Sequence, residues 1–224
     1  MAVASVPLSH IFETTVLQLE RDLKTLPKNV WTIRACLERV VIFCNADSHT
    51  NKADIDEQWC RRKDHYNKHI GWTIPSWEML SQIKQIGRPI CDYGSGSGLL
   101  IHLLKLIGCD AYGVDYHHYT NEWGNVGKFC RPKVYVMSED QIFHVPSDHI
   151  FLISWGYINR DPINDYIERG GKCVIIIGED DEGCTHPPYD LFNDMSDWTC
   201  QIIEIPNFYG IYTKMSINRR TANL

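Results

Sequence analysis

A glycine-rich stretch at residues 88–98, RPICDYGSGSG, constrains the fold more than any other part of the sequence. A short apolar run ends at Asp92, glycines alternate with serines from Gly94 to Gly98, and the apolar run LLIHLLKLIG follows. Alternating glycines let the backbone turn tightly and approach a ligand, and the first N–H groups of a following helix face that ligand. We therefore predict a buried strand, a ligand-binding turn and a helix. The alternative is a plain surface loop between the same two elements.

The spacing of these glycines separates two classes of cofactor. The dinucleotide fingerprint G-x-G-x-x-G requires its third glycine at the position that Leu99 occupies in this chain. The stretch from Asp92 to Gly98 instead resembles the first motif of the class I S-adenosylmethionine-dependent methyltransferases, in which an acidic residue and one spacer precede alternating glycines. The resemblance implies that the turn packs against the methionine part of the cofactor, and that Asp92 orients the turn or its bound water.

Acidic residues follow two later predicted strands. Asp115 ends the run 111–115 and lies 23 positions beyond Asp92, close to the spacing at which a Rossmann-like unit places an acid on the ribose hydroxyls. The alternative is that Asp115 merely ends a strand. After the third predicted strand, the resemblance implies an acidic side chain that reads the adenine amino group, for which Glu139 is the first choice and Asp140 the second.

The order of the apolar segments predicts an α/β protein. We expect a Rossmann-like class I methyltransferase fold, a seven-stranded and mostly parallel sheet with an antiparallel C-terminal hairpin over 198–205 and 211–217. That hairpin distinguishes the sheets of methyltransferases from those of dehydrogenases. Apolar stripes at helical spacing predict helices before the glycine stretch. Residues 1–70 are therefore expected to form a helical N-terminal extension, and residues 71–224 the cofactor-binding domain.

From about Trp72 to Arg220 the resemblance narrows to an uncharacterised methyltransferase-like group. The shared features are Trp72 with IP at 74–75, NEW at 121–123, SWGY at 154–157, GE at 178–179 and GCT at 183–185. The chain departs from the group at Gly156, where a proline is usual. The resemblance does not supply the methyl acceptor.

The ends of the fourth and fifth predicted strands provide candidates for the acceptor site. In amine-methylating relatives the fourth motif grips a planar nitrogen; Ser154 and Tyr157 fit its outer positions, while its two prolines are replaced here. Glu179 leaves the fifth strand on the ligand side, where a carboxylate can act as a base or bind a substrate cation. We expect the acceptor between Trp72, Trp155, Tyr157 and Glu179, with Tyr157 and Glu179 as catalytic candidates. The alternative is that the aromatic side chains only pack on the cofactor or on a helix.

The predicted S-adenosylmethionine contacts come from the glycine turn and the strand ends: Asp92, Gly94, Ser95, Gly96, Gly98, Asp115, Tyr116, Glu139, Asp140, Ser154 and Trp155. The sulfonium makes the methyl group of this cofactor electrophilic, so the protein mainly aligns donor and acceptor, excludes water and removes a proton where the acceptor requires it. No special nucleophile is needed. The acceptor can accordingly be a small molecule, a protein or a nucleotide-like group.

Composition limits the partners. The formal net charge of −6 over 224 residues gives no global attraction to nucleic acid, and it is compatible with a compact site for a cap or a single base. No apolar run has the length of a bilayer span, and the first residues lack the pattern of a signal peptide. We expect a cytoplasmic protein with no membrane partner. The 9 cysteines contain no C-x-x-C and the 10 histidines no H-E-x-x-H, so we expect reduced thiols and no metal site.

Three classes of function follow from these observations. The preferred interpretation is an active S-adenosylmethionine-dependent methyltransferase. A catalytically inactive, methyltransferase-like module that binds the cofactor or a partner is the first alternative, since the fourth motif is irregular. An NAD(P)-dependent oxidoreductase is the second, and both the glycine spacing and the predicted hairpin oppose it.

Overall fold

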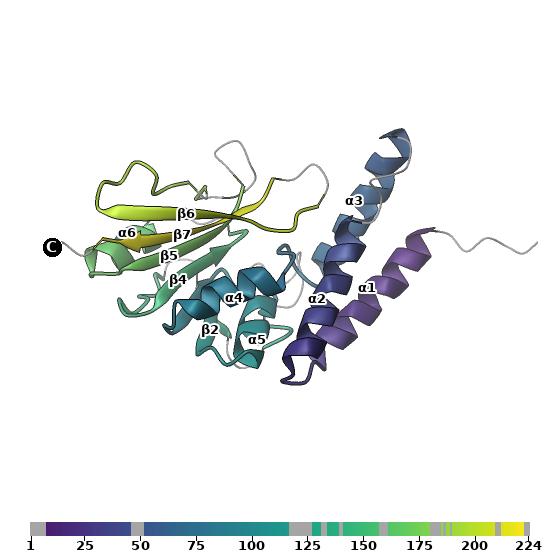
Figure 1. Cartoon of the computed structure of the whole chain (residues 1–224), viewed down its shortest axis with the longest axis horizontal. Helices are drawn as coiled ribbons and strands as arrows, with labels where there is room; N and C mark the ends of the chain where they lie inside the picture. The colour runs from purple at the N-terminus through teal and green to yellow at the C-terminus, as the bar shows by residue number, and fades with distance from the viewer. Residues whose placement is uncertain are drawn as a thin grey trace, which may run out of the picture.

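The strands of the described residues form one seven-stranded sheet, with helices packed around it (Figure 1). The computed structural model describes residues 8–45, 52–116, 127–130, 134–138, 141–156, 161–179, 185, 187–188, 190–208 and 212–221. The strands are β1 (Ile90–Tyr93), β2 (Ala111–Tyr116), β3 (Val134–Met137), β4 (Ile150–Ser154), β5 (Cys173–Gly178), β6 (Trp198–Glu204) and β7 (Lys214–Arg220). Their order across the sheet is β3-β2-β1-β4-β5-β7-β6.

The direction of the strands confirms the predicted fold class. Every neighbouring pair from β3 to β5 is parallel, whereas β7 runs antiparallel to both β5 and β6. The order reverses at β1, from which the chain proceeds outward to β2 and β3 on one side and to β4 and β5 on the other. In an open α/β sheet, a ligand binds at the carboxyl ends of the strands at such a switch point.

Helices cover both faces of the sheet. Helices α4 (Trp77–Gln85) and α5 (Leu99–Leu106) pack on one face, and α6 (Asp161–Glu168) packs on the other (Figure 1). In β5, Ile175 belongs to the core under α4 and α5, while Val174 belongs to the core under α6. Both faces of β5 are buried, as its continuous apolar run predicted for a central parallel strand.

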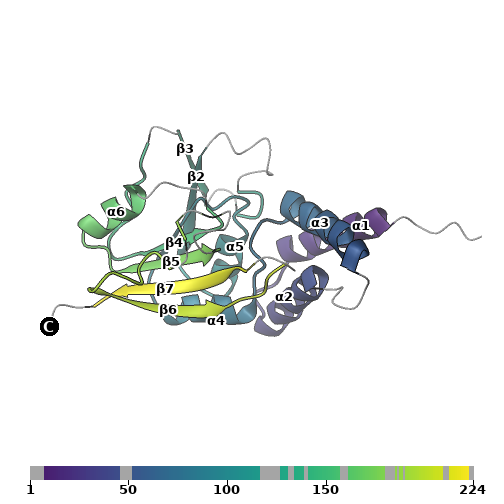
Figure 2. The same ribbon diagram turned by 90° about the horizontal axis from the view of Figure 1, so that it is seen from above.

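Three helices come before α4 in the chain: α1 (Leu8–Lys24), α2 (Val30–Asn45) and α3 (Lys52–His69). They lie at the end of the sheet toward which the parallel strands point, as Figure 2 shows. Their buried side chains, such as Val16 and Leu37, join the core under α4 and α5. The predicted N-terminal helices are therefore confirmed, and the division of the chain into domains 1–70 and 71–224 stays a prediction.

Along the described part of the chain, no helix combines the length and the apolar character that crossing a membrane requires. Nor do three or more His, Cys, Asp or Glu side chains gather there as a metal ion would need. The cysteines among these residues are free thiols.

Candidate functional site

The glycine turn lies where β1 ends and α5 begins, at the switch point of the sheet. Gly94, Gly96 and Gly98 have φ values of 79°, 52° and 75°, which side chains other than glycine rarely adopt. A Cβ atom on Gly94 or Gly96 would meet nothing within 4 Å. Backbone conformation therefore requires these two glycines, and the described residues leave the space beside them open.

Asp115 brings the end of β2 to this turn. Its side chain is 5% exposed, and one carboxylate oxygen accepts a hydrogen bond from the Gly96 N–H. The other oxygen accepts one from the Tyr116 N–H at 2.7 Å. The structure thus brings together the two motifs that sequence spacing had related, the glycine turn and the acid of the second strand. Tyr116 follows directly, and its hydroxyl lies 3.1 Å from the Tyr93 hydroxyl.

Asp92 and Ser95 place unpaired polar atoms beneath the turn. Asp92 is 1% exposed, and neither its Oδ1 nor the buried Oγ of Ser95 has a hydrogen-bond partner. Burial, and then the neighbouring Asp115 carboxylate, raise the pKa of Asp92 from 3.8 to about 8. Buried polar atoms without partners are uncommon and costly, of order 1–3 kcal/mol each. The turn therefore holds two buried polar atoms at a cost in stability, directly beneath the glycines.

Gly113 in β2 makes room for the turn, although sequence reasoning did not single it out. A Cβ atom at this position would lie 2.6 Å from the Ser95 Cβ, much closer than any real contact. Only glycine in β2 lets Ser95 lie against the strand. A signal was present in the sequence, because Gly113 is an isolated glycine in the second predicted strand, and such a glycine indicates close approach of another backbone.

A second turn, residues 127–130, braces the glycine turn. The Gly127 N–H donates to the Gly96 carbonyl at 2.9 Å, and the Phe129 N–H donates to the Ser97 carbonyl at 2.9 Å. On the side of the N-terminal helices, the Ser97 hydroxyl donates to the Ile70 carbonyl at 2.7 Å. The described part of the glycine turn is thus held between residues 127–130 and the segment that follows α3.

Trp155 begins the second part of the site, at the end of β4. Its φ of 52° is a strained value for a tryptophan, and its N–H donates to the Ile177 carbonyl at 2.8 Å. The indole stacks on that of Trp72, with ring centroids 5.7 Å apart and an interplanar angle of 29°. A hydrogen bond joins the hydroxyls of Ser154 and Thr73. Two segments that are far apart in sequence therefore meet here.

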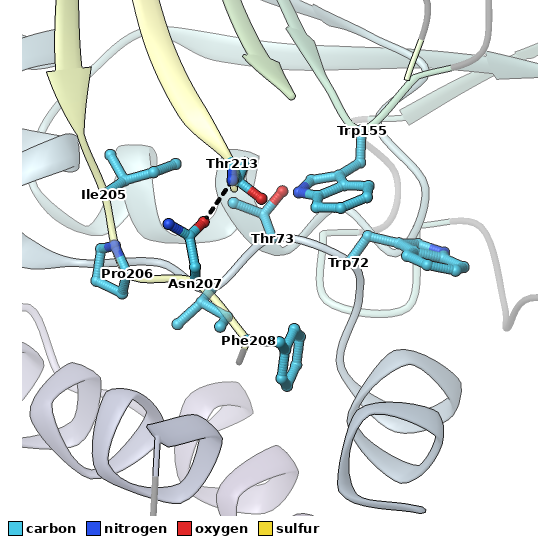
Figure 3. Close-up of a pocket in the computed structure, with 9 residues that line it drawn as sticks. Trp72, Thr73, Trp155, Ile205, Pro206, Asn207, Phe208 and Thr213 are labelled. Carbon is cyan, nitrogen blue, oxygen red and sulfur yellow. Dashed lines mark hydrogen bonds between the residues drawn. The ribbon is translucent and has the colours of Figure 1, made fainter. Parts of the chain in front are cut away.

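A recess lies beside these aromatic rings (Figure 3). Its wall combines the 72–74 segment, Trp155 and the connection between β6 and β7; the lining residues are Trp72, Thr73, Ile74, Trp155, Ile205, Pro206, Asn207, Phe208 and Thr213. Figure 3 shows the Trp155 indole reaching toward Thr73 and Thr213, while Trp72 points to the opposite side. The Asn207 Oδ1 accepts a hydrogen bond from the Thr213 N–H at 2.8 Å. Sequence reasoning anticipated Trp72 and Trp155 but not the residues after β6.

Of the other predicted site residues, the structure describes Glu179 and leaves three undescribed. Glu179 is half-buried directly after β5, and its N–H donates to the Thr185 Oγ1 at 2.7 Å. It does not line the recess. Glu139, Asp140 and Tyr157 lie outside the described residues. The roles predicted for all four side chains stay predictions.

No protein-family profile matches the sequence, and no curated protein matches it. Among solved structures, the methyltransferase domain of bacterial CtHen1-C is similar, with a TM-score of 0.45 and 12% identity over 65% of this chain and 96% of that chain. Magnesium protoporphyrin IX methyltransferase (ChlM) from Synechocystis PCC 6803, with bound S-adenosylmethionine, has a TM-score of 0.44 and 12% identity, covering 98% of this chain and 100% of that one. The 23S rRNA methyltransferase ErmE has a TM-score of 0.40 and 12% identity, with 66% and 69% covered. The α/β fold with a mostly parallel seven-stranded sheet and an antiparallel C-terminal hairpin follows from the strand order and directions of this chain, independently of these similarities.

Proposed function

We propose that this chain is an S-adenosylmethionine-dependent methyltransferase. The observation that carries the proposal is the hydrogen bond between the Asp115 carboxylate and the glycine turn. This contact lies at the switch point of a sheet in which β7 runs antiparallel to β5. A ligand at this point lies across the carboxyl ends of β1 and β2. We propose that Asp115 accepts hydrogen bonds there from two ribose hydroxyls.

The charges around the turn support this cofactor over a dinucleotide. Two buried acids lie at the turn: Asp115, and Asp92, whose raised pKa of about 8 leaves it mostly protonated at neutral pH until a nearby cation favours its ionised form. A dinucleotide would bring its negative pyrophosphate to such a turn, whereas S-adenosylmethionine carries a sulfonium and an ammonium group. The raised pKa of Asp92 favours a cationic ligand near the turn, because a positive charge stabilises the carboxylate form of this buried group.

When bound, S-adenosylmethionine supplies an electrophilic methyl group. The described residues would then bind and orient the cofactor: the glycine turn would hold the methionine part, Asp115 the ribose hydroxyls, and Tyr116 is a proposed contact of the nucleoside. Glu139 and Asp140, by their place after β3, are the proposed contacts of the adenine amino group. Ser154 and Trp155 are the proposed contacts from the end of β4.

The recess at the end of β4 is the proposed entrance for the acceptor. Trp72 and Trp155 stack there, and we propose that their aromatic surface borders the acceptor beside the cofactor. Tyr157 and Glu179 are the proposed catalytic groups, with the Glu179 carboxylate receiving the proton of an acceptor that must lose one. The net charge of −6 supports an acceptor other than a long nucleic acid, and we propose that the protein acts in the cytoplasm.

Calorimetric titration of the full chain with S-adenosylmethionine, S-adenosylhomocysteine and NAD tests this function. We expect saturable binding of the first two, at one per chain, and no binding of NAD. Tighter binding of NAD would favour the oxidoreductase alternative and overturn the proposal. Binding of S-adenosylmethionine without formation of S-adenosylhomocysteine, across acceptor panels of small molecules, peptides and nucleotides, would favour the inactive module.

A further inference from the structure

The position of the glycine turn depends on residues 127–130, which hold two of its carbonyls. The Gly96 and Ser97 carbonyls accept hydrogen bonds from Gly127 and Phe129, both at 2.9 Å. A Cβ atom on Gly98 would lie 3.3 Å from the Cys130 Cβ, so the two turns are also in close contact. Any displacement of residues 127–130 therefore moves the proposed cofactor turn.

Lys128 fastens this brace to the N-terminal helices. Its Nζ lies 2.9 Å from Glu20 Oε1 in α1, and it donates a hydrogen bond to the His69 carbonyl at the end of α3 at 3.0 Å. The side chains of Lys128 and Glu20 are 17% and 12% exposed. Charge-assisted contacts that are shielded from solvent are stronger and geometrically better defined than exposed ion pairs.

The same connection extends to the recess. The residue after His69 is Ile70, whose carbonyl accepts the hydrogen bond of Ser97 at 2.7 Å, and Trp72 follows two positions later. The end of α3 is thus bonded to both turns immediately before the chain reaches the stacked indoles.

We propose that Lys128 is a positioning residue, which couples the glycine turn to α1 and to the Trp72 segment. Occupation of the turn by a ligand and the placement of Trp72 then depend on each other, since both are bonded to the same short segments. Lys128 does not have to touch the cofactor or the acceptor for this role. The effect on ligand affinity rests on the proposed function, whereas the mechanical coupling does not.

Glu20 has other partners, so replacing Lys128 does not leave the Glu20 carboxylate unpaired. Lys24 Nζ lies 2.7 Å from the same Glu20 oxygen, and His69 Nδ1 lies 3.4 Å from the other oxygen. Removing the Lys128 charge leaves Glu20 paired with Lys24, so no unpaired charge is stranded in the interface. A change at the glycine turn then reflects lost coupling rather than an isolated buried charge.

The variants Lys128→Met, Lys128→Arg and Glu20→Gln test the coupling. The matched control is Asp22→Asn, which removes another ion pair of α1, Asp22 with Arg39 at 2.8 Å, and leaves both turns untouched. We expect Lys128→Met to weaken binding of S-adenosylhomocysteine about 10-fold, within the usual range of coupling between sites. Lys128→Arg should recover most of that loss, and the control should bind like the wild type.

Hydrogen exchange of the ligand-free chain gives the second measurement. Lys128→Met should speed exchange at the Gly127 and Phe129 amides several-fold, and Asp22→Asn should not. The double variant of Lys128→Met with Glu20→Gln should bind ligand no more weakly than Lys128→Met alone, because one connection is broken in both. Unchanged exchange at these amides overturns the coupling even if the wild type binds no ligand. Equal loss of affinity in Lys128→Met and Asp22→Asn also overturns it, because general destabilisation would then account for the effect.

Discussion

Replacing Asp92 with Asn is expected to stabilise the ligand-free protein at alkaline pH. Asp92 is 1% exposed, and burial together with the Asp115 carboxylate raises its pKa from 3.8 to about 8. A carboxyl whose pKa is higher in the folded state than in the unfolded state stabilises the fold while it is protonated. This contribution is complete below about pH 4 and is lost as the pH rises toward 8. Asn has a similar shape and no ionisation, so the loss disappears in the variant.

The magnitude follows from the number of protons bound. Between pH 6 and pH 8 the folded protein keeps most of the Asp92 proton while the unfolded chain has released it, and each full pH unit then costs about 1.4 kcal/mol. Because the folded pKa is reached at the upper limit, the total over this range is about 2 kcal/mol. All other titratable groups are common to the two proteins. The difference in unfolding free energy between Asp92→Asn and the wild type should therefore grow by about 2 kcal/mol from pH 6 to pH 8.

Urea denaturation followed by circular dichroism at pH 6, 7 and 8 measures this difference. Asp110→Asn is the matched control, because Asp110 is an exposed acid that directly precedes β2. A difference for Asp92→Asn that is the same at all three pH values would refute the reasoning, since Asp92 would then be ionised in the folded protein across the range. A larger pH dependence in the control would refute it as well.

Three further predictions concern the same site. Gly113→Ala should lower the unfolding free energy by about 1–3 kcal/mol in thermal denaturation, because its Cβ would meet the Ser95 Cβ at 2.6 Å; unchanged stability would contradict the close fit. Trp155→Asn should be at least as stable as Trp155→Leu, because Asn tolerates the φ of 52° and Leu does not; the reverse order would show that the positive φ is absent in solution. Binding of S-adenosylmethionine at pH 7.5 should release up to about one proton, since a cation lowers the raised pKa of Asp92; titrations in phosphate and Tris with equal apparent enthalpies would contradict this.

Local sequence patterns predicted the parts of the structure that depend on near neighbours. Alternating glycines predict a turn because glycine readily adopts positive φ values. The apolar runs at 111–115 and 173–178 predict strands that are covered on both faces of a parallel sheet. The spacing from Asp92 to Asp115 follows from one strand, one helix and the next strand. The Asp92 and Asp115 carboxyl groups are close enough to interact electrostatically because adjacent parallel strands end at the same edge of the sheet.

The remaining features depend on contacts between distant segments, which periodicity does not reveal. Lys128 and Glu20 are 108 positions apart, and neither stands out among the charged residues of the sequence. The need for Gly113 arises only when Ser95 lies against β2. The recess requires the connection after β6, whose residues Pro206 and Asn207 read simply as part of a hairpin. Sequence reasoning predicted the proposed cofactor side of the site because its motifs are short and local, and it missed the residues that support the glycine turn because those contacts join distant segments.

The affinity of Asp115→Ala for S-adenosylmethionine tests the central claim most directly. Loss of charge-assisted bonds to both ribose hydroxyls should weaken binding by about 1.5–3 kcal/mol, roughly 10- to 150-fold. Asp115→Asn, which keeps an oxygen for the Gly96 N–H, separates the loss of charge from loosening of the turn. Asp110→Ala controls for removal of an exposed acid at the opposite end of β2. The account predicts weak binding in both Asp115 variants and wild-type affinity in the control. Wild-type affinity in Asp115→Ala would contradict it, since the ribose would then be held elsewhere.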